Sequence, residues 1–202
     1  MNHIEHPLRC KCGTVQGFVA TSNALSRGVC YCEDCQLYAQ FLGNPDDVLD
    51  AQGGTDVVPT KPSNVRFTQG IESLAVMRLT DHGLMRWYAK CCNTPIGNTS
   101  PNYKQAFVGL VHSCLENSSI SLDQSFGPVR MRVNTKHARG DTHIKQQGMF
   151  GTIIKLIRML VRERLTGGYK VTPFFHAESG LPIVVPRVLS TQERQALQTQ
   201  LR

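Results

Sequence analysis

Short segments in which apolar and polar residues alternate dominate the first 125 residues of the chain. These segments are rich in Val, Phe, Tyr and Trp, and turn residues separate them, which is typical of β-strands. The pattern predicts strands at residues 14–20, 28–31, 64–68, 73–79, 84–89 and 105–111. Because no stretch with helical period separates successive strands, the sheet is expected to be mostly antiparallel.

Glycine and proline interrupt regular structure, so the segments that contain them between these strands are predicted to be loops. These segments are the Gly53/Gly54 pair, the Pro59/Pro62 pair, residues 81–83 and residues 94–101. One short helix is expected after Cys32, in the sequence EDCQLYAQ. The first 125 residues are therefore predicted to form one compact, mainly β domain.

The pattern becomes helical in the second part of the chain, residues 126–202. Residues 149–165 have a wide apolar face and a narrow polar stripe, which predicts an amphipathic helix that ends at Gly167 and Gly168. Docking on the β domain best explains so wide an apolar face, although helices on membrane surfaces also combine apolar and basic residues. Ser190 and Glu193 have the spacing of a capping box and predict a last helix to about residue 201.

Charge is distributed unevenly between these two parts. Residues 1–125 contain 9 Lys and Arg against 11 Asp and Glu, a net charge of −2, whereas residues 126–202 contain 13 against 4, a net charge of +9. A basic region of this kind suits nucleic acid, an anionic membrane or an acidic protein, and a solvated basic face is the simpler interpretation. The basic cluster comprises Arg130, Arg132, Lys136, His137 and Arg139, and no recognised nucleic-acid motif accompanies it.

Eight cysteines are the most informative feature of the composition. The N-terminal sequence MNHIEHPLRCKCG lacks the apolar core of a signal peptide, and no run approaches the roughly 20 apolar residues of a membrane span. We therefore expect a cytoplasmic protein, in which cysteines serve as thiolates for metal or redox chemistry more often than as disulfides.

Seven of the eight cysteines fall into three short motifs, CKC at residues 10–12, CYCEDC at 30–35 and CC at 91–92. Zinc favours thiolate ligands, and closely spaced cysteines place two sulfurs on one ion at little entropic cost. The predicted metal ligands are Cys10, Cys12, Cys91, Cys92, Cys30, Cys32 and Cys35. Cys114 lies outside the motifs and is expected to be a buried, small apolar residue.

The order CxCG, CxCxxC and CCNTP resembles the glutathione-dependent formaldehyde-activating enzyme family, whose relatives include centromere protein V. The resemblance covers about residues 7–112. It implies a compact antiparallel β domain of the formaldehyde-activating-enzyme type that binds two zinc ions, here followed by a helical C-terminal extension. One zinc would be structural and bound by Cys10 and Cys12 with the last motif, and the other would lie near the substrate, bound by Cys30, Cys32 and Cys35.

The last motif departs from the family pattern CxxCGTP. Cys92 matches its second cysteine, but Ala89 stands at the first and Asn93 at the glycine. Two interpretations of the structural site follow. Either Cys91 supplies the fourth ligand, for which adjacent ligands need a strained backbone, or three cysteines bind the ion and water or another side chain completes the site.

Two functions are consistent with these motifs. The resemblance implies a carbon–sulfur lyase that forms or cleaves adducts of a glutathione-like thiol with a formaldehyde-like aldehyde, as S-hydroxymethylglutathione synthase does. Three cysteine ligands would leave the zinc at Cys30, Cys32 and Cys35 an open fourth position for such chemistry. The alternative is a zinc-stabilised, non-enzymatic binding module whose basic C-terminal region contacts nucleic acid, anionic membrane or protein. The choice between enzyme and binding module stays open at this point, as does the oligomeric state.

Overall fold

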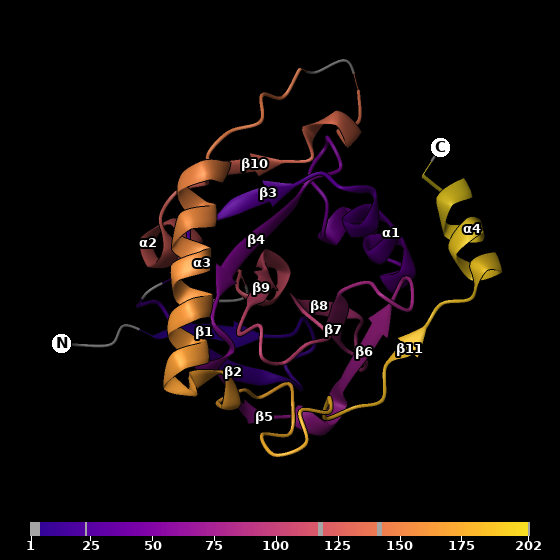
Figure 1. The fold of residues 1–202 in the computed structure, drawn as a ribbon. Coiled ribbons are helices and arrows are strands. Elements are labelled where there is room, and N and C mark those ends of the chain that lie inside the picture. The colour runs from indigo at the N-terminus through magenta and orange to yellow at the C-terminus, as the bar shows by residue number, and fades with distance from the viewer. Residues whose placement is uncertain (1–4, 23, 117–118, 141–142, 202) are drawn as a thin grey trace.

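The structure, a computed structural model, describes residues 5–22, 24–116, 119–140 and 143–201. Within these ranges eleven strands form two sheets and four α-helices lie around them (Figure 1). The strand order is β1-β2-β5 in the smaller sheet and β10-β3-β4-β9-β8-β7-β6-β11 in the larger one. The fold is therefore mixed, with a framework of strands.

The elements follow one another along the chain. The strands are β1 (Glu5–Arg9), β2 (Gln16–Ala20), β3 (Gly28–Cys30), β4 (Thr55–Thr60), β5 (Val65–Gln69), β6 (Leu74–Arg78), β7 (Met85–Ala89), β8 (Thr94–Thr99), β9 (Val108–Val111), β10 (Met131–Val133) and β11 (Arg187–Val188). The helices are α1 (Glu33–Leu42), α2 (Leu122–Phe126), α3 (Met149–Thr166) and α4 (Thr191–Thr199).

Residues from the second part of the chain supply both edges of the larger sheet. β10 pairs with β3 and β11 pairs with β6, and these two pairings are parallel. The other pairings among the described strands are antiparallel. The division into a zinc-binding β domain of residues 1–125 and a basic extension of residues 126–202 stays a prediction.

The six predicted strands are confirmed as β2, β3, β5, β6, β7 and β9. The loop predicted at residues 94–101 is wrong, because residues 94–99 form β8, whose residues are all buried between β7 and β9. Small residues permit this close packing, since a Cβ added at Gly97 would lie 3.0 Å from the carbonyl oxygen of Gly109. Glycine here marks a close approach of two strands and not a turn.

Pro59, also expected in a loop, lies in β4 instead. Its carbonyl oxygen accepts a hydrogen bond from the amide of Leu25 (2.9 Å), on the β3 side of the strand. β3 pairs only with residues 55–57 of β4. The missing N–H of Pro59 therefore faces a side on which the neighbouring strand has already ended, so no ladder hydrogen bond is lost.

The main hydrophobic core lies between the two sheets. Leu8 and Val19 of the smaller sheet belong to the same buried cluster as Val76 and Trp87 of the larger one. Phe174, from the segment after α3, packs its ring against Trp87 with centroids 5.1 Å apart. The C-terminal part of the chain thus contributes to the core as well as to the sheet edges.

The helices predicted after Cys32 and after Ser190 are both confirmed. Cys32 is the N-cap of α1, and the helix is terminated by Gly43, which adopts the left-handed conformation (φ 83°). Ser190 and Glu193 form the predicted capping box of α4. Leu197 of α4 packs against the buried cluster that contains Leu37 of α1, so the last helix covers the first.

The helix predicted at residues 149–165 is confirmed as α3, and it ends at Gly167. The expected docking of its apolar face on the β domain is wrong. Thr152 and Glu163 are the buried residues of α3, whereas its large apolar side chains, including Phe150 and Leu165, are exposed. The side of α3 that faces the sheets is therefore not its most apolar side. None of the described helices has the length and apolarity needed to cross a bilayer.

His6 connects β1 to the end of the first part of the chain. Its buried ring lies between the Leu115 carbonyl oxygen, 2.8 Å from Nε2, and the Ser125 hydroxyl, 2.8 Å from Nδ1. Burial lowers the pKa of His6 below its ordinary value of 6.5, and the hydrogen bond to Leu115 offsets this only partly. A neutral ring that donates from Nε2 and accepts at Nδ1 satisfies both partners.

We predict that His6 makes the fold less stable in mild acid. As pH falls through 6.5 the unfolded chain takes up the proton before the folded chain does, so the free energy of unfolding decreases. Urea unfolding of the wild type and of His6→Gln at pH 7.5 and 5.5 measures this contribution. The stability advantage of the wild type should shrink at pH 5.5. An advantage of equal size at both pH values would contradict the prediction.

Candidate metal centres

Cys10 and Cys12 lie in the turn that joins β1 to β2. The amide of Gly13, which has a left-handed backbone (φ 81°), donates to the Cys10 carbonyl oxygen at 2.9 Å and closes the turn. The amide of Val15 lies 3.2 Å from the sulfur of Cys10. Burial raises the pKa of Cys10 above its ordinary value, and the hydrogen bond from Val15 offsets this only partly.

Cys91 and Cys92 lie in the turn that joins β7 to β8. The next residue, Asn93, adopts the left-handed conformation (φ 54°), which asparagine tolerates better than most residues. Its side-chain amide donates to the carbonyl oxygen of Leu42 at 3.1 Å. Asn93 therefore accommodates the backbone at the position where the resembled family has glycine, and Ala89 is buried at the end of β7.

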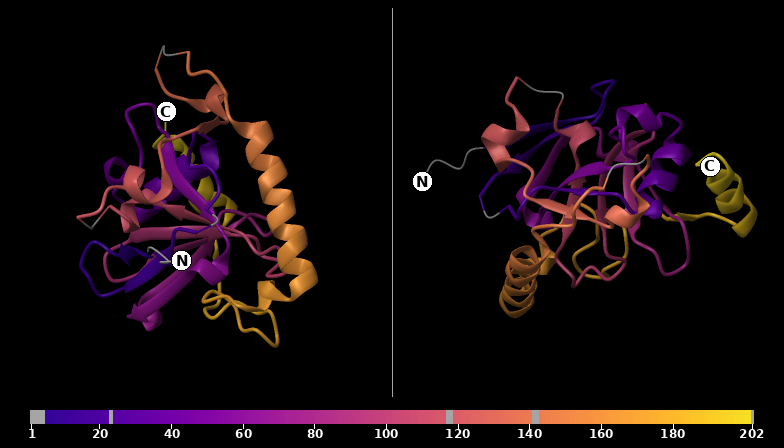
Figure 2. Two further views of the ribbon diagram at one scale, coloured as in Figure 1. Left: turned by 90° about the vertical axis from the view of Figure 1, so that its left-hand side faces the viewer. Right: turned by 90° about the horizontal axis from the view of Figure 1, so that it is seen from above.

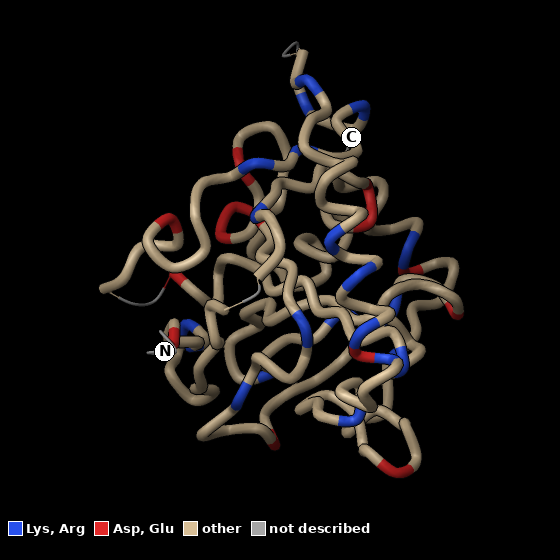
Figure 3. The backbone as a smooth tube through the Cα atoms, turned by 60° about the vertical axis from the view of Figure 1, so that its left-hand side comes forward, with Lys and Arg blue, Asp and Glu red and all other residues tan. Residues whose placement is uncertain are grey.

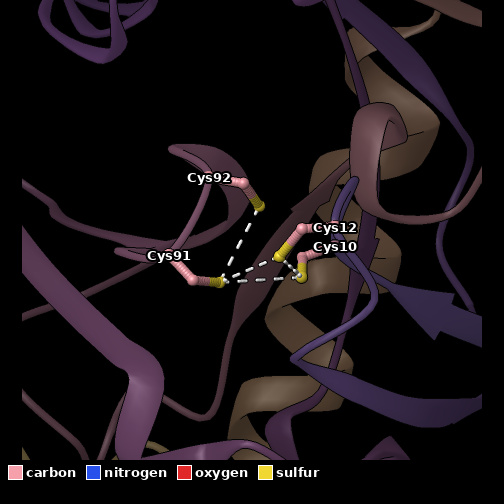
Figure 4. Close-up of side chains that lie close together, drawn as sticks. All are labelled: Cys10, Cys12, Cys91 and Cys92. Atoms are coloured by element: carbon pink, nitrogen blue, oxygen red, sulfur yellow. Dashed lines mark hydrogen bonds between the residues drawn. The ribbon is translucent and has the colours of Figure 1, made fainter.

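The four sulfurs of these two turns face one another (Figure 4). The sulfur–sulfur distances are 3.6 Å for Cys10–Cys12, 3.9 Å for Cys10–Cys91, 3.3 Å for Cys12–Cys91 and 3.8 Å for Cys91–Cys92. Sulfurs bound to one zinc at about 2.3 Å lie about 3.8 Å apart at the corners of a tetrahedron. Bonded sulfurs would be about 2.05 Å apart, and all eight cysteines are free thiols. We call these four residues the four-cysteine centre, and it can hold a metal ion.

Electrostatics within the four-cysteine centre favour a cation. A hydrogen bond with the Thr14 hydroxyl is the main cause that lowers the pKa of Cys12 to about 6. Burial, with the hydrogen bond to Cys12, raises the pKa of Cys91 to about 12. Negative charge is therefore present near neutral pH and is shared among neighbouring sulfurs, which is the donor chemistry that zinc selects.

The second group consists of Cys30, Cys32 and Cys35, which we call the three-cysteine centre. Cys30 ends β3, Cys32 is the N-cap of α1, and Cys35 lies in the first turn of that helix. The three sulfurs lie within 4.8 Å of one another. The positive end of the helix dipole lies beside them and stabilises thiolates.

One negative charge is shared among the sulfurs of the three-cysteine centre. Hydrogen bonds from Cys32 and then Cys35 lower the pKa of Cys30 to about 2, against the effect of burial. The hydrogen bond with Cys30 raises the pKa of Cys32 to about 11. Three sulfurs that already share a charge form a favourable site for a divalent cation, to which all three would bind as thiolates.

Two polar side chains lie beside the three-cysteine centre and were not identified from the sequence. The Asn134 amide nitrogen lies 3.4 Å from the sulfur of Cys30, and Nη1 of Arg86 lies 3.9 Å from the sulfur of Cys35. The Arg86 side chain is only 2% exposed. Three thiolates and one divalent cation would carry a net charge of −1, and the guanidinium of Arg86, which also lies 3.4 Å from an Asp34 carboxylate oxygen, offsets part of the negative charge there.

The structure brings the seven predicted ligands together in two separate groups. Among the described residues, no histidine, aspartate, glutamate or further cysteine joins the three-cysteine centre within 4.8 Å. Cys114 is buried outside both groups, as expected. Both groups can hold metal ions of the kind that thiolates bind, and zinc fits them. The assignment of individual ligands and of catalytic residues stays a prediction.

We predict two zinc ions per chain, one of them bound by both Cys91 and Cys92. Cys91→Ala and Cys92→Ala should each reduce the zinc content toward one ion, measured by elemental analysis with a count of free thiols. Structural zinc contributes about 10–16 kcal/mol to the folding free energy of small domains. Losing even about 3 kcal/mol of stability would therefore lower Tm by roughly 6–12 °C.

Cys114→Ala serves as the matched control because it removes a thiol that lies outside both centres. This variant should retain two zinc ions, although it creates a small packing defect. If Cys91→Ala kept both ions and resisted chelators as the wild type does, adjacent ligation by Cys91 and Cys92 would be wrong.

Comparison with known proteins adds a family to this description. One solved structure, the crystal structure of a Rhodobacter sphaeroides protein, is 18% identical over 56% of this chain and 90% of that chain, with a TM-score of 0.38. No curated protein matches the chain. The model of a family of unknown function, DUF6151, matches residues 1–184. The chain therefore belongs to the DUF6151 family.

Proposed function

We propose that the protein binds two zinc ions and that the three-cysteine centre catalyses the formation or cleavage of adducts between a small thiol and an aldehyde. The single observation that supports this proposal most is the convergence of three cysteine sulfurs without a fourth metal-binding side chain among the described residues. Zinc held by three protein ligands keeps an exchangeable position, whereas four-ligand sites are structural. The four-cysteine centre is accordingly assigned the structural role.

The proposed reaction needs no oxidant or reductant. In the forward direction a carbon–sulfur bond forms between the thiol and the carbonyl carbon, and the thiol proton ends on the carbonyl oxygen. The reverse reaction breaks the same bond and returns that proton to sulfur. Zinc at the three-cysteine centre supplies Lewis acidity and lowers the pKa of a thiol at its open position.

The residues around the three-cysteine centre support recognition of an anionic thiol such as glutathione. A surface hollow is lined by Glu33 and Gln36 of α1, the residues that directly follow Cys32 and Cys35 in the chain. The lining residues are Glu33, Gln36, His137, Arg139, Gln198 and Leu201. Nε of Arg139 donates to the side-chain oxygen of Gln36 at 2.8 Å, which holds this guanidinium at the hollow. An arginine held in this way binds carboxylates, which glutathione carries.

We predict that the protein accelerates the exchange between formaldehyde and S-hydroxymethylglutathione by at least about tenfold over the uncatalysed rate. Exchange NMR with labelled formaldehyde and glutathione measures that rate. Cys32→Ser should remove the acceleration. Arg139→Gln should raise the glutathione concentration at which the acceleration reaches half of its maximum. A second readout is the visible spectrum of the cobalt-substituted protein, which should change when glutathione binds.

Cys114→Ala provides the control, since it should keep the full rate and the spectral change. A wild-type rate equal to the uncatalysed rate would reject the lyase proposal for this substrate pair. An unchanged cobalt spectrum at millimolar glutathione would reject thiol binding at the three-cysteine centre, whatever the rate.

A further inference from the structure

α3 presents three different sides along its length. Thr152, Leu156, Met159 and Glu163 recur at helical spacing and form the side that faces the sheets, because all four are buried or partly buried; Leu160, also partly buried, lies at the edge of this side. A second set, also at helical spacing, consists of exposed apolar residues: Phe150, Ile154, Ile157, Val161 and Leu165. A third set is basic and consists of Lys155, Arg158 and Arg162. Helical periodicity therefore separates sheet-facing, apolar and basic sides.

The apolar side is open to solvent. Phe150 and Leu165, near the two ends of α3, are 80% and 81% exposed, and Ile157 and Val161 between them are 54% and 52% exposed. Figure 2 shows α3 along the outside of the molecule, and in the view from above it stands beyond the outline of the sheets. A continuous apolar stripe of this kind marks an interaction surface.

The basic side gives that surface a strong positive charge. Lys155, Arg158 and Arg162 line a hollow together with Lys61 from the segment after β4. In Figure 3 the positions of Lys and Arg, in blue, recur along α3. Glu163, the one acidic residue of α3, is buried, and its Oε1 lies 3.2 Å from Nζ of Lys61. Several cations around one hollow, beside a single paired carboxylate, suit a phosphate group.

The size and charge of the surface argue against a second copy of the chain as its partner. A helix of 18 residues is about 27 Å long, so a stripe about 10 Å wide covers roughly 270 Å², well below the roughly 800 Å² per partner of a stable interface. A two-fold contact through this side would also bring the basic side chains of both copies together. Nucleic acid would use the cations but would leave the apolar side chains in water.

We propose that α3 binds an anionic lipid membrane, with its apolar side among the acyl chains near the surface and its basic hollow around a lipid phosphate. A lipid surface accommodates both sides of the helix at once, because apolar burial and attraction to anionic headgroups act together. The helix lies in the plane of the membrane and does not cross it. The inference is independent of the zinc chemistry proposed above.

Co-sedimentation with vesicles tests the proposal on the whole chain of 202 residues. Vesicles of phosphatidylcholine with about 30% phosphatidylserine should bind the wild type, and phosphatidylcholine alone should bind at least about tenfold more weakly. Ile157→Glu/Val161→Glu should weaken binding to the anionic vesicles by at least about tenfold. Arg158→Gln/Arg162→Gln should weaken binding and reduce its dependence on salt.

Leu84→Glu is the matched control, because it adds a charge at an exposed apolar residue outside α3. Leu84 directly precedes β7, which lies in the half of the larger sheet that ends with β11. It should bind vesicles as the wild type does, and an unchanged far-UV circular dichroism spectrum should show that each variant is folded. Absence of vesicle binding at low salt would overturn the proposal, as would equal binding by Ile157→Glu/Val161→Glu. The proposal would also be overturned if the wild type were a dimer that this double variant dissociates. It would equally be overturned if soluble glycerophosphate competed for the protein as strongly as the vesicles do.

Discussion

The four-cysteine centre lies where one hairpin of each sheet meets the other, so its four sulfurs bring the two sheets together at this point. Cys10 and Cys12 come from a hairpin of the smaller sheet, and Cys91 and Cys92 come from a hairpin of the larger one. Two like charges about 4 Å apart repel by about 4 kcal/mol at an effective dielectric constant of about 20. Four ionised sulfurs at this spacing need a multivalent cation, and zinc would convert the repulsion into a link between the hairpins. The amide of Lys11, which donates to the Thr94 hydroxyl at 3.0 Å, is a further connection between the same turns.

α1 connects the four-cysteine centre to the three-cysteine centre. Asn93, directly after Cys92, donates to the carbonyl oxygen of Leu42 at the C-terminal end of α1. The N-terminal end of the same helix begins at Cys32 and carries Cys35. A rigid helix held at one end by a structural centre can fix the ligands at its other end, which the proposed chemistry at the three-cysteine centre requires.

The sequence predicted the cysteine groups and six of the eleven described strands but not their surroundings. Thiolate ligands are few and closely spaced, so CxC and CxxC motifs indicate a site before any fold is known. β8 was missed because Pro95 and Gly97 are turn residues in most contexts, and here they lie in a buried central strand. Arg86 and Asn134 come from remote segments; only the charge of Arg86 in an otherwise apolar strand hinted at a partner. Periodicity correctly predicted α3, but it shows which residues share a side and not what that side contacts.

The most direct test of this account is a crystal structure with anomalous diffraction data collected at the zinc absorption edge. We predict an anomalous peak about 2.3 Å from each of the four sulfurs of the four-cysteine centre, and a second peak among the three sulfurs of the three-cysteine centre. Disulfides joining these cysteines, or a hairpin of Cys10 and Cys12 that lies apart from Cys91 and Cys92 with no peak between them, would contradict it.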